Sequence, residues 1–301
     1  MQLDPTMSAI PVQLRNEWLE AEVAPRGAEL WSLRSVRTGL QYVWQGDARW
    51  WDRRAPILFP IVGHLPEGRY RFRDKDYRLP THGFAPDRIF QLSQPNPSSL
   101  EARLLWDSES LRAWPFRFEL RIGYALDGPA LRQGCAVRNC GPEEMYFSIG
   151  FHPGFRCPLR EGERFEDYTV RFERPETLPR HDLQSGLRTG HTRPFLQNSS
   201  EIPLKKELFT EGAIVLQAPS SRCADLWNPR TGHGVRCGIQ GAPWLGLWTR
   251  GEGPFLCIEP WHGITGRTGA GCDLPAKEGI RRLPPGGIFE CGMEITPLLP
   301  E

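Results

Sequence analysis

The chain has 301 residues, of which 37 are basic and 36 acidic, 24% are charged and 39% hydrophobic. A net charge of +1 argues against nucleic acid or an anionic membrane as the main partner, and this composition is not that of a disordered chain. Glycine and proline, with 31 and 29 residues, interrupt the chain too often for long helices. We expect a single large domain over residues 1–301.

Alternation of apolar and polar residues recurs along the chain and predicts β-strands. In chain order, we expect strands over residues 118–126, 168–172, 235–239 and 289–295. Turns rich in glycine and proline separate them, and short helices fit only near 109–113 and 204–208. A period of two is what an antiparallel sheet with one packed face requires. The sequence therefore predicts an all-β fold of mostly antiparallel strands with few short helices, a large sandwich or barrel.

The sequence also bears on cellular location. It contains no run of about 20 apolar residues, the length of a membrane helix, and its first residues, MQLDPTMSAIPVQLRNEW, do not have the pattern of a secretory signal. The eight cysteines form no C-x-x-C pair, which gives little support to a zinc or dithiol site. We expect a reduced, cytoplasmic protein that does not bind a membrane.

Three short segments place ionisable side chains among aromatic residues and chain breakers: 80–85 (PTHGFA), 148–155 (SIGFHPGF) and 255–263 (FLCIEPWHG). In the third, we expect Glu259 at the end of a strand, with Pro260 stopping further pairing. A carboxyl group beside large apolar rings has a raised pKa that suits proton transfer. In the second, proline and glycine after His152 can hold the imidazole rigidly. The alternative interpretation of these segments is that they are turns with packed aromatic residues and have no catalytic role.

Eleven tryptophans are a second indication of a binding site. Indole rings stack on the C–H faces of sugars and offer an N–H donor, although most tryptophans are core residues. A metal site is not favoured, because no histidines have the i, i+2 or i, i+4 spacing; its ligands would be His82, His152, Glu259 and His262. The sequence has no nucleophile elbow and no phosphate-binding loop.

The three segments occur in the same order as similar motifs of the aldose 1-epimerase (mutarotase) family: HGFA at 82–85, GFHPGF at 150–155 and IEPW at 258–261. Further matches are RGAELWSL at 26–33, APILFPIVG at 55–63 and KEGI…LPPG at 277–286. The resemblance spans about residues 20–297, and the chain most resembles the LacX-like and hexose-6-phosphate-epimerase-like branches. This resemblance implies a galactose-mutarotase-like β-supersandwich. It also implies a cofactor-independent isomerase that interconverts the α and β anomers of a free sugar, acting as a monomer or homodimer.

The resemblance also implies roles for individual residues. Glu259 matches the general base that removes the proton of the C1 hydroxyl, and His152 the general acid that protonates the ring oxygen. His82 matches a group that hydrogen-bonds near the ring oxygen and C1. No metal is expected. The predicted sugar-binding residues are Arg54, His64, Asp225, Asn228, Trp248 and Trp261.

The sequence departs from the family pattern in two places. Pro86 stands where the family commonly has an arginine, which lies at the phosphate in the hexose-phosphate branch, and this favours an unphosphorylated sugar. His64 stands where LacX-like sequences often have arginine. Two alternatives remain open, a hexose-6-phosphate 1-epimerase and a non-catalytic carbohydrate-binding β-sandwich. Glycoside hydrolysis is a weaker one, because it needs a second carboxylate across the sugar.

Overall fold

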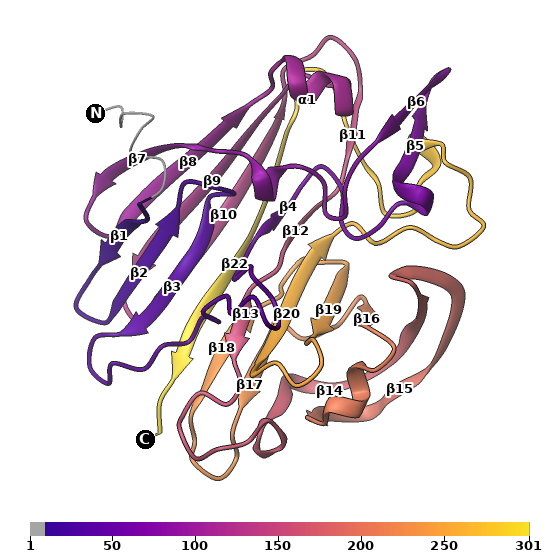
Figure 1. Cartoon of the computed structure of the whole chain (residues 1–301). Helices are drawn as coiled ribbons and strands as arrows, with labels where there is room; N and C mark the ends of the chain where they lie inside the picture. Colours follow the sequence, from indigo (N-terminus) through magenta and orange to yellow (C-terminus); the bar gives the residue numbers. More distant parts are fainter. Residues whose placement is uncertain (1–9, 301) are drawn as a thin grey trace.

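The computed structural model describes residues 10–300 (Figure 1). In the first half of the chain the strands are β1 (Val12–Arg15), β2 (Leu19–Ala24), β3 (Glu29–Ser35), β4 (Ile57–Leu58), β5 (Arg69–Phe72), β6 (Lys75–Arg78), β7 (Gln91–Asn96), β8 (Ser99–Leu105), β9 (Phe118–Asp127), β10 (Ala130–Asn139) and β11 (Met145–Phe147). In the second half they are β12 (Ile149–Phe151), β13 (Gly154–Arg156), β14 (Thr169–Gln184), β15 (Leu187–Pro203), β16 (Ile214–Gln217), β17 (Cys223–Trp227), β18 (Gly234–Gly238), β19 (Trp244–Trp248), β20 (Phe255–His262), β21 (Arg281–Leu283) and β22 (Ile288–Leu298).

Helices are short. The α-helix α1 (Ser108–Ala113) is capped by the preceding Asp107, whose side chain accepts the N–H of Ser110. The others are single 3-10 turns, η2 (Pro66–Gly68), η3 (Ala85–Asp87), η4 (Phe165–Asp167), η5 (Lys206–Phe209) and η6 (Leu274–Ala276). The all-β prediction is confirmed, and the four predicted strands correspond to β9, β14, β18 and β22, with residues 168 and 239 falling just outside β14 and β18. Of the two predicted helices, the first is α1 and the second is only the 3-10 turn η5.

Most strands belong to one continuous antiparallel sheet. Its order is β4-β12-β20-β19-β16-β14-β17-β18-β22-β10-β9-β8-β7, with β13 beside β20 and β15 beside β14. The β14–β15 hairpin is the long curved arm at the lower right of Figure 1. Separate small sheets are β1-β2-β3, β5-β6 and β11-β21.

The β1-β2-β3 sheet packs on the part of the large sheet that contains β9. Alternate residues of β9, such as Leu120 and Ile122, are fully buried and join Leu30 and Leu33 of β3 in one apolar core. Burying such a side chain contributes about 1.5–3 kcal/mol each. The Tyr124 hydroxyl donates a 2.6 Å hydrogen bond from β9 to the backbone carbonyl of residue 28, just before β3. The apolar residues of the period-two pattern therefore form the packed interface between the small β1-β2-β3 sheet and the large sheet.

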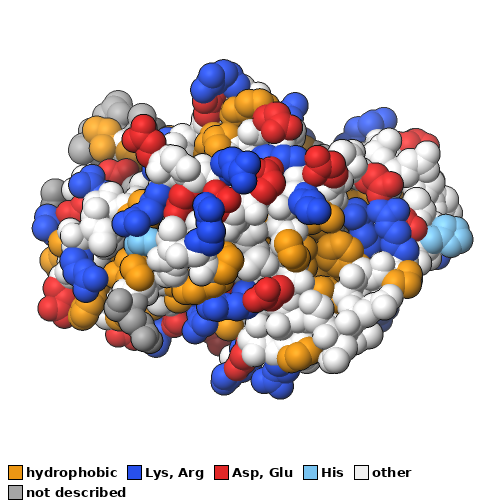
Figure 2. All heavy atoms as spheres, turned by 90° about the horizontal axis from the view of Figure 1, so that it is seen from below, with side chains coloured by type: hydrophobic (Ala, Val, Ile, Leu, Met, Phe, Trp, Pro, Cys, Tyr) orange, Lys and Arg blue, Asp and Glu red, His pale blue; other side chains and the backbone are white. Residues whose placement is uncertain are grey.

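The surface carries both signs of charge. Figure 2 shows basic and acidic side chains interspersed over one face, with apolar side chains between them. Among residues 10–300, no helix combines the length and the apolar character needed to span a bilayer.

Strand β20 differs from the prediction and determines where the candidate site lies. The strand does not end at Glu259 but continues to His262, paired with β19 through Pro260 and Trp261. On its other side β20 pairs with β13 up to Cys257 and with β12 from Trp261 onward. Pro260, which has no N–H to donate, falls in the break between these two partners, so the strand tolerates it.

Candidate active site

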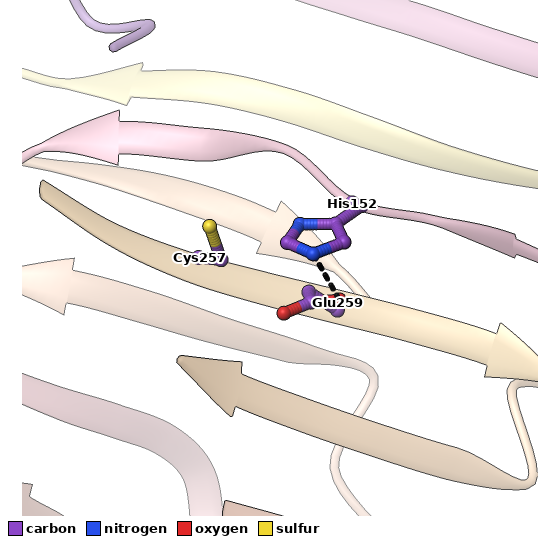
Figure 3. Close-up of side chains that lie close together, drawn as sticks. All are labelled: His152, Cys257 and Glu259. Atoms are coloured by element: carbon purple, nitrogen blue, oxygen red, sulfur yellow. Dashed lines mark ion pairs between the residues drawn. The ribbon is translucent and has the colours of Figure 1, made fainter. Parts of the chain in front are cut away.

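His152 lies in the break between β12 and β13, opposite the middle of β20. In the ladder, position 150 pairs with 261 and position 154 with 257, so β12 and β13 keep a single register along β20. That register puts position 152 opposite position 259, and opposed residues of an antiparallel pair point to the same face. Figure 3 shows the two side chains directed at each other, with His152 Nε2 3.2 Å from Glu259 Oε2. Two motifs that are about one hundred residues apart thus meet through strand register.

The Glu259 carboxyl group is almost completely buried, with 1% of the residue exposed. Trp261 Nε1 donates a 3.2 Å hydrogen bond to the same oxygen, Oε2, that contacts His152. Burial raises the pKa of Glu259 well above its usual value, and the Trp261 hydrogen bond opposes this rise only in part. With both contacts on Oε2, Oε1 is the oxygen available to a ligand.

The His152 ring is held between aromatic side chains. The Trp51 ring stacks on it with centroids 4.8 Å apart, and the Trp248 ring meets it edge-on at 5.7 Å. Burial lowers the pKa of His152 well below its usual value. Because burial raises the pKa of the carboxyl group and lowers that of the imidazole, a proton shared across the 3.2 Å contact between Glu259 and His152 is favoured on Glu259.

His82 approaches the pair from a loop after β6. Its ring lies 5.4 Å from that of His152, nearly perpendicular to it. The backbone N–H of Gly63 donates to His82 Nδ1 at 3.1 Å, and burial lowers the pKa of His82 to about 3. The ring is therefore neutral and carries its proton on Nε2, as a donor. The loop passes so close to β4 that a Cβ on Gly83, which has φ of 76°, would lie 2.3 Å from the Phe59 carbonyl oxygen.

These groups open into a cavity of about 340 Å³, a size typical of small-ligand sites. Three of the predicted sugar-binding residues, His64, Trp248 and Trp261, line it with His82, His152 and Glu259. The β14–β15 hairpin closes one wall: Gly186, at its turn, packs so tightly on the His64 ring that a Cβ there would come within 2.5 Å. The Thr265 hydroxyl donates to the Gly186 carbonyl at 2.7 Å and fixes that turn.

The other three predicted sugar-binding residues do not line the cavity. The Arg54 guanidinium turns away, donating to the Trp31 carbonyl at 2.7 Å and stacking over the Trp31 ring at 3.8 Å. Asp225 on β17 is held between the guanidinium groups of Arg171 and Arg236. Asn228 is fully buried, and its side chain accepts the N–H of Arg230 in the β17–β18 turn. The geometry gives no support to a sugar contact by Arg54, Asp225 or Asn228.

Several residues of the cavity were not predicted from the sequence: Trp51, Arg53, Asp87, Leu183, Gly186, Glu211 and Thr265. Trp51 had a signal that was overlooked, because it lies in a Trp-Trp doublet four residues before the APILFPIVG segment. The hairpin residues had none, since nothing local to the β14–β15 turn says which loop it touches.

Three side chains lie close enough to hold one ion. Ligand atoms of His152, Cys257 and Glu259 are all within 4.8 Å of one another (Figure 3). A metal binds the thiolate and carboxylate forms. Burial raises the pKa of both Cys257 and Glu259 well above the usual values, so two of the three ligands hold protons that a metal would have to displace. His262, the fourth residue of the candidate metal set, contacts Arg281 and Phe289 and does not line the cavity.

The whole architecture is that of the galactose mutarotase-like proteins. The X-ray structure of the galactose mutarotase related enzyme from Lactobacillus acidophilus superposes with a TM-score of 0.92 at 30% sequence identity, covering 96% of this chain and 97% of that one. A galactose mutarotase-like protein from Lactobacillus casei gives a TM-score of 0.90 at 29% identity, covering 95% of this chain and 99% of the other. The predicted fold type is confirmed.

The sequence identifies the family. The family model described as aldose 1-epimerase matches residues 11–296, and the chain belongs to this family. It is LacX-like: the chromosomal protein LacX of Lactococcus lactis subsp. lactis is 34% identical over an alignment of 295 residues that covers 95% of this chain and 98% of LacX. The family resemblance found in the sequence motifs is confirmed.

Proposed function

We propose that the protein is an aldose 1-epimerase that interconverts the α and β anomers of a free sugar, with Glu259 and His152 as the proton-transfer pair. The observation that carries this proposal is the direct 3.2 Å contact between these two groups in a cavity lined by tryptophan rings. An acid and a base whose pKa values are displaced by burial are what ring opening near neutral pH requires.

The reaction balances with the one proton that the pair holds. Once that proton has passed from Glu259 to His152 across their 3.2 Å contact, ionised Glu259 takes the proton of the C1 hydroxyl through Oε1 while His152 gives its proton to the ring oxygen. The bond between C1 and the ring oxygen breaks, leaving an open-chain aldehyde, protonated Glu259 and neutral His152. Rotation about the C1–C2 bond and reversal of both transfers close the ring as the other anomer. Each transfer contributes about 10²–10⁴-fold.

His82 supports this step as a neutral donor. Its Nδ1 is occupied by the Gly63 N–H, so Nε2–H is the group it offers to a sugar oxygen. A pKa of about 3 keeps it uncharged while the pair exchanges protons, and it therefore does not compete with His152 as an acid.

An unphosphorylated sugar fits the charges of the cavity. Arg53 lines the cavity, but its guanidinium group already contacts other groups of the protein. These are the Pro86 carbonyl at 2.9 Å, Glu29 at 3.6 Å and Asp87. A phosphate would have to break these contacts. The apolar faces of Trp51, Trp248 and Trp261 suit the C–H face of a pyranose instead.

The test follows optical rotation of freshly dissolved α-glucose, α-galactose and glucose-6-phosphate with the native protein and with Glu259→Gln. We expect at least one free sugar to equilibrate faster with native protein, and the Glu259→Gln variant to lose most of that gain. Faster equilibration of glucose-6-phosphate alone would mean that the substrate is a sugar phosphate and not a free sugar. Equal rates for both proteins on every sugar, with sugar binding measured by calorimetry, would show a binding protein instead.

A further inference from the structure

Outside the cavity, two cysteines face each other across the large sheet. Cys135 on β10 and Cys291 on β22 are direct partners in the antiparallel ladder, and both are free thiols. Directly opposed residues of an antiparallel ladder have Cα atoms about 4.5–5.5 Å apart, which lies within the range of about 4.4–6.8 Å that a disulfide needs. The backbone therefore already holds the two thiols at a spacing that small adjustments convert to a bond.

The surroundings of Cys291 favour its ionised form. The Arg281 guanidinium of β21 lies 3.1 Å from His262 Nδ1, and because a guanidinium can only donate, Nδ1 accepts and the ring proton is on Nε2. His262 thus offers an N–H donor to the Cys291 sulfur. Hydrogen bonds from Cys135 and His262, and the nearby positive charge of Arg281, lower the pKa of Cys291 to about 6.

Arg281 is the cation whose charge acts on this thiol. Its side chain is partly buried over the Phe289 ring, 4.1 Å from the centroid, and within residues 10–300 the charge that interacts with it is that of Cys291 rather than of a carboxylate. A desolvated cation needs a nearby anion. The Cys291 thiolate is the anion that the fold places there, and Tyr124 of β9 faces Cys135 as a further, neutral group.

The two thiols differ in a way that suits a reactive and a resolving cysteine. Cys291 is partly exposed, whereas Cys135 is buried, and burial beside Cys291 raises the pKa of Cys135 well above its usual value. A peroxide can therefore reach Cys291, whose thiolate attacks it. Cys135 lies buried beside Cys291 and is a protonated thiol.

We propose that Cys291 is a peroxide-reactive thiolate that forms a cross-strand disulfide with Cys135. In the first step the Cys291 sulfur attacks one oxygen of a hydroperoxide, the O–O bond breaks, and Cys291 becomes a sulfenic acid while the other oxygen leaves as hydroxide or alkoxide. In the second step the Cys135 sulfur attacks the sulfenic sulfur, and the hydroxyl group leaves as water with the Cys135 proton. Two thiols are oxidised and one peroxide is reduced.

The experiment uses the full chain carrying Cys140→Ser and Cys272→Ser, which removes the two most exposed thiols. After treatment with hydrogen peroxide at pH 7, peptide mapping without reductant is expected to find the Cys135–Cys291 peptide pair, and intact mass is expected to fall by two hydrogen atoms. Dithiothreitol restores the original mass. Absence of the linked pair, or oxidation of Cys291 to sulfinic acid while Cys135 remains alkylatable, would overturn the proposal.

Two variants separate a reactive site from chance proximity. Cys135→Ser is expected to leave Cys291 at the sulfenic acid, which dimedone traps, and Cys291→Ser is expected to leave Cys135 unoxidised. The rate of Cys291 alkylation should rise with pH around a midpoint near 6, and His262→Gln should move that midpoint upward toward the usual thiol value of about 8.5. A Cys291 midpoint above 8 in the parent chain would contradict the role of His262 and Arg281.

Discussion

Glu259 and Asp225 are both buried carboxyl groups on strands of the same sheet, 1% and 2% exposed, yet their neighbours differ. Asp225 accepts hydrogen bonds from Arg171 at 3.1 Å and from Arg236 at 2.8 and 3.0 Å. The polar contacts of Glu259 within residues 10–300 are with His152 and Trp261, neither of which carries a permanent charge.

This difference separates a structural carboxylate from one suited to chemistry. The two guanidinium groups compensate the charge of Asp225 and hold its carboxylate in a fixed position in the sheet. Within residues 10–300 no guanidinium group contacts the Glu259 carboxyl group, and burial raises its pKa. Burial of an acid alone is therefore a poor marker of an active site, whereas burial beside a titratable partner without arginine is a good one.

The largest expected effect tests whether Glu259 and His152 act as one unit. We expect Glu259→Gln and His152→Asn each to lower kcat/KM for the responsive sugar by about 10²–10⁴-fold. The double variant should lose about as much as either single variant, because one group without the other transfers no proton. Asp225→Asn, measured per folded molecule, should keep the native kcat/KM. Additive losses in the double variant would mean that the two groups act independently.

The next-largest expected effect is on stability, where the substitution of Asp225 is expected to cost more than that of Glu259. Asp225→Ala leaves two guanidinium groups without their partner, a change that costs about 3–5 kcal/mol when the charges are buried. Because the side chains of Arg171 and Arg236 are 34% and 45% exposed, water screens them, and we expect a smaller loss of about 1–3 kcal/mol. Urea unfolding at pH 7 measures it, with Asp127→Ala, a mutation in an exposed ion pair, as the control.

Glu259→Gln is expected to be at least as stable as the native protein in the same measurement. The folded pKa of Glu259 lies above its unfolded value of about 4.5, so above that pH the unfolded state releases a proton that the folded state retains. Stability therefore falls as pH rises from about 4.5 toward the folded pKa. Glutamine removes this cost and still accepts the Trp261 N–H. A clear loss of stability in Glu259→Gln would assign the carboxyl group a structural role like that of Asp225.

The sequence predicted the individual strands better than the contacts between them. Strands such as β9 and β22 follow from alternation, because one face of each is packed and the other is not. The motifs around His152 and Glu259 marked two residues that lie in contact in the structure, but that contact depends on the register of β12 and β13 along β20, which no local pattern encodes. The predicted end of β20 at Glu259 was wrong for the same reason, since Pro260 is tolerated only where two partner strands meet.

The candidate binding residues divide in a similar way. His64 and Trp248 line the cavity and remain predicted sugar contacts. Arg54, Asp225 and Asn228 are polar residues whose partners lie within the protein, such as the Trp31 carbonyl for Arg54. Sequence reveals the type of a polar side chain but not which partner satisfies it, because that partner is distant along the chain.

The smallest effect concerns His82, and it tests whether the His152–Glu259 pair alone titrates. We expect kcat/KM to have a bell-shaped dependence on pH, with an acid limb where the pair takes up a second proton and an alkaline limb where it loses its only one. His82, with a pKa of about 3, stays neutral throughout, so His82→Asn should leave both limbs in place. The plateau should fall by up to about tenfold, because one neutral hydrogen bond is worth about 0.5–1.5 kcal/mol. Displacement of the acid limb in His82→Asn would instead make His82 part of the proton relay, and the uncompensated site would then contain three coupled groups rather than two.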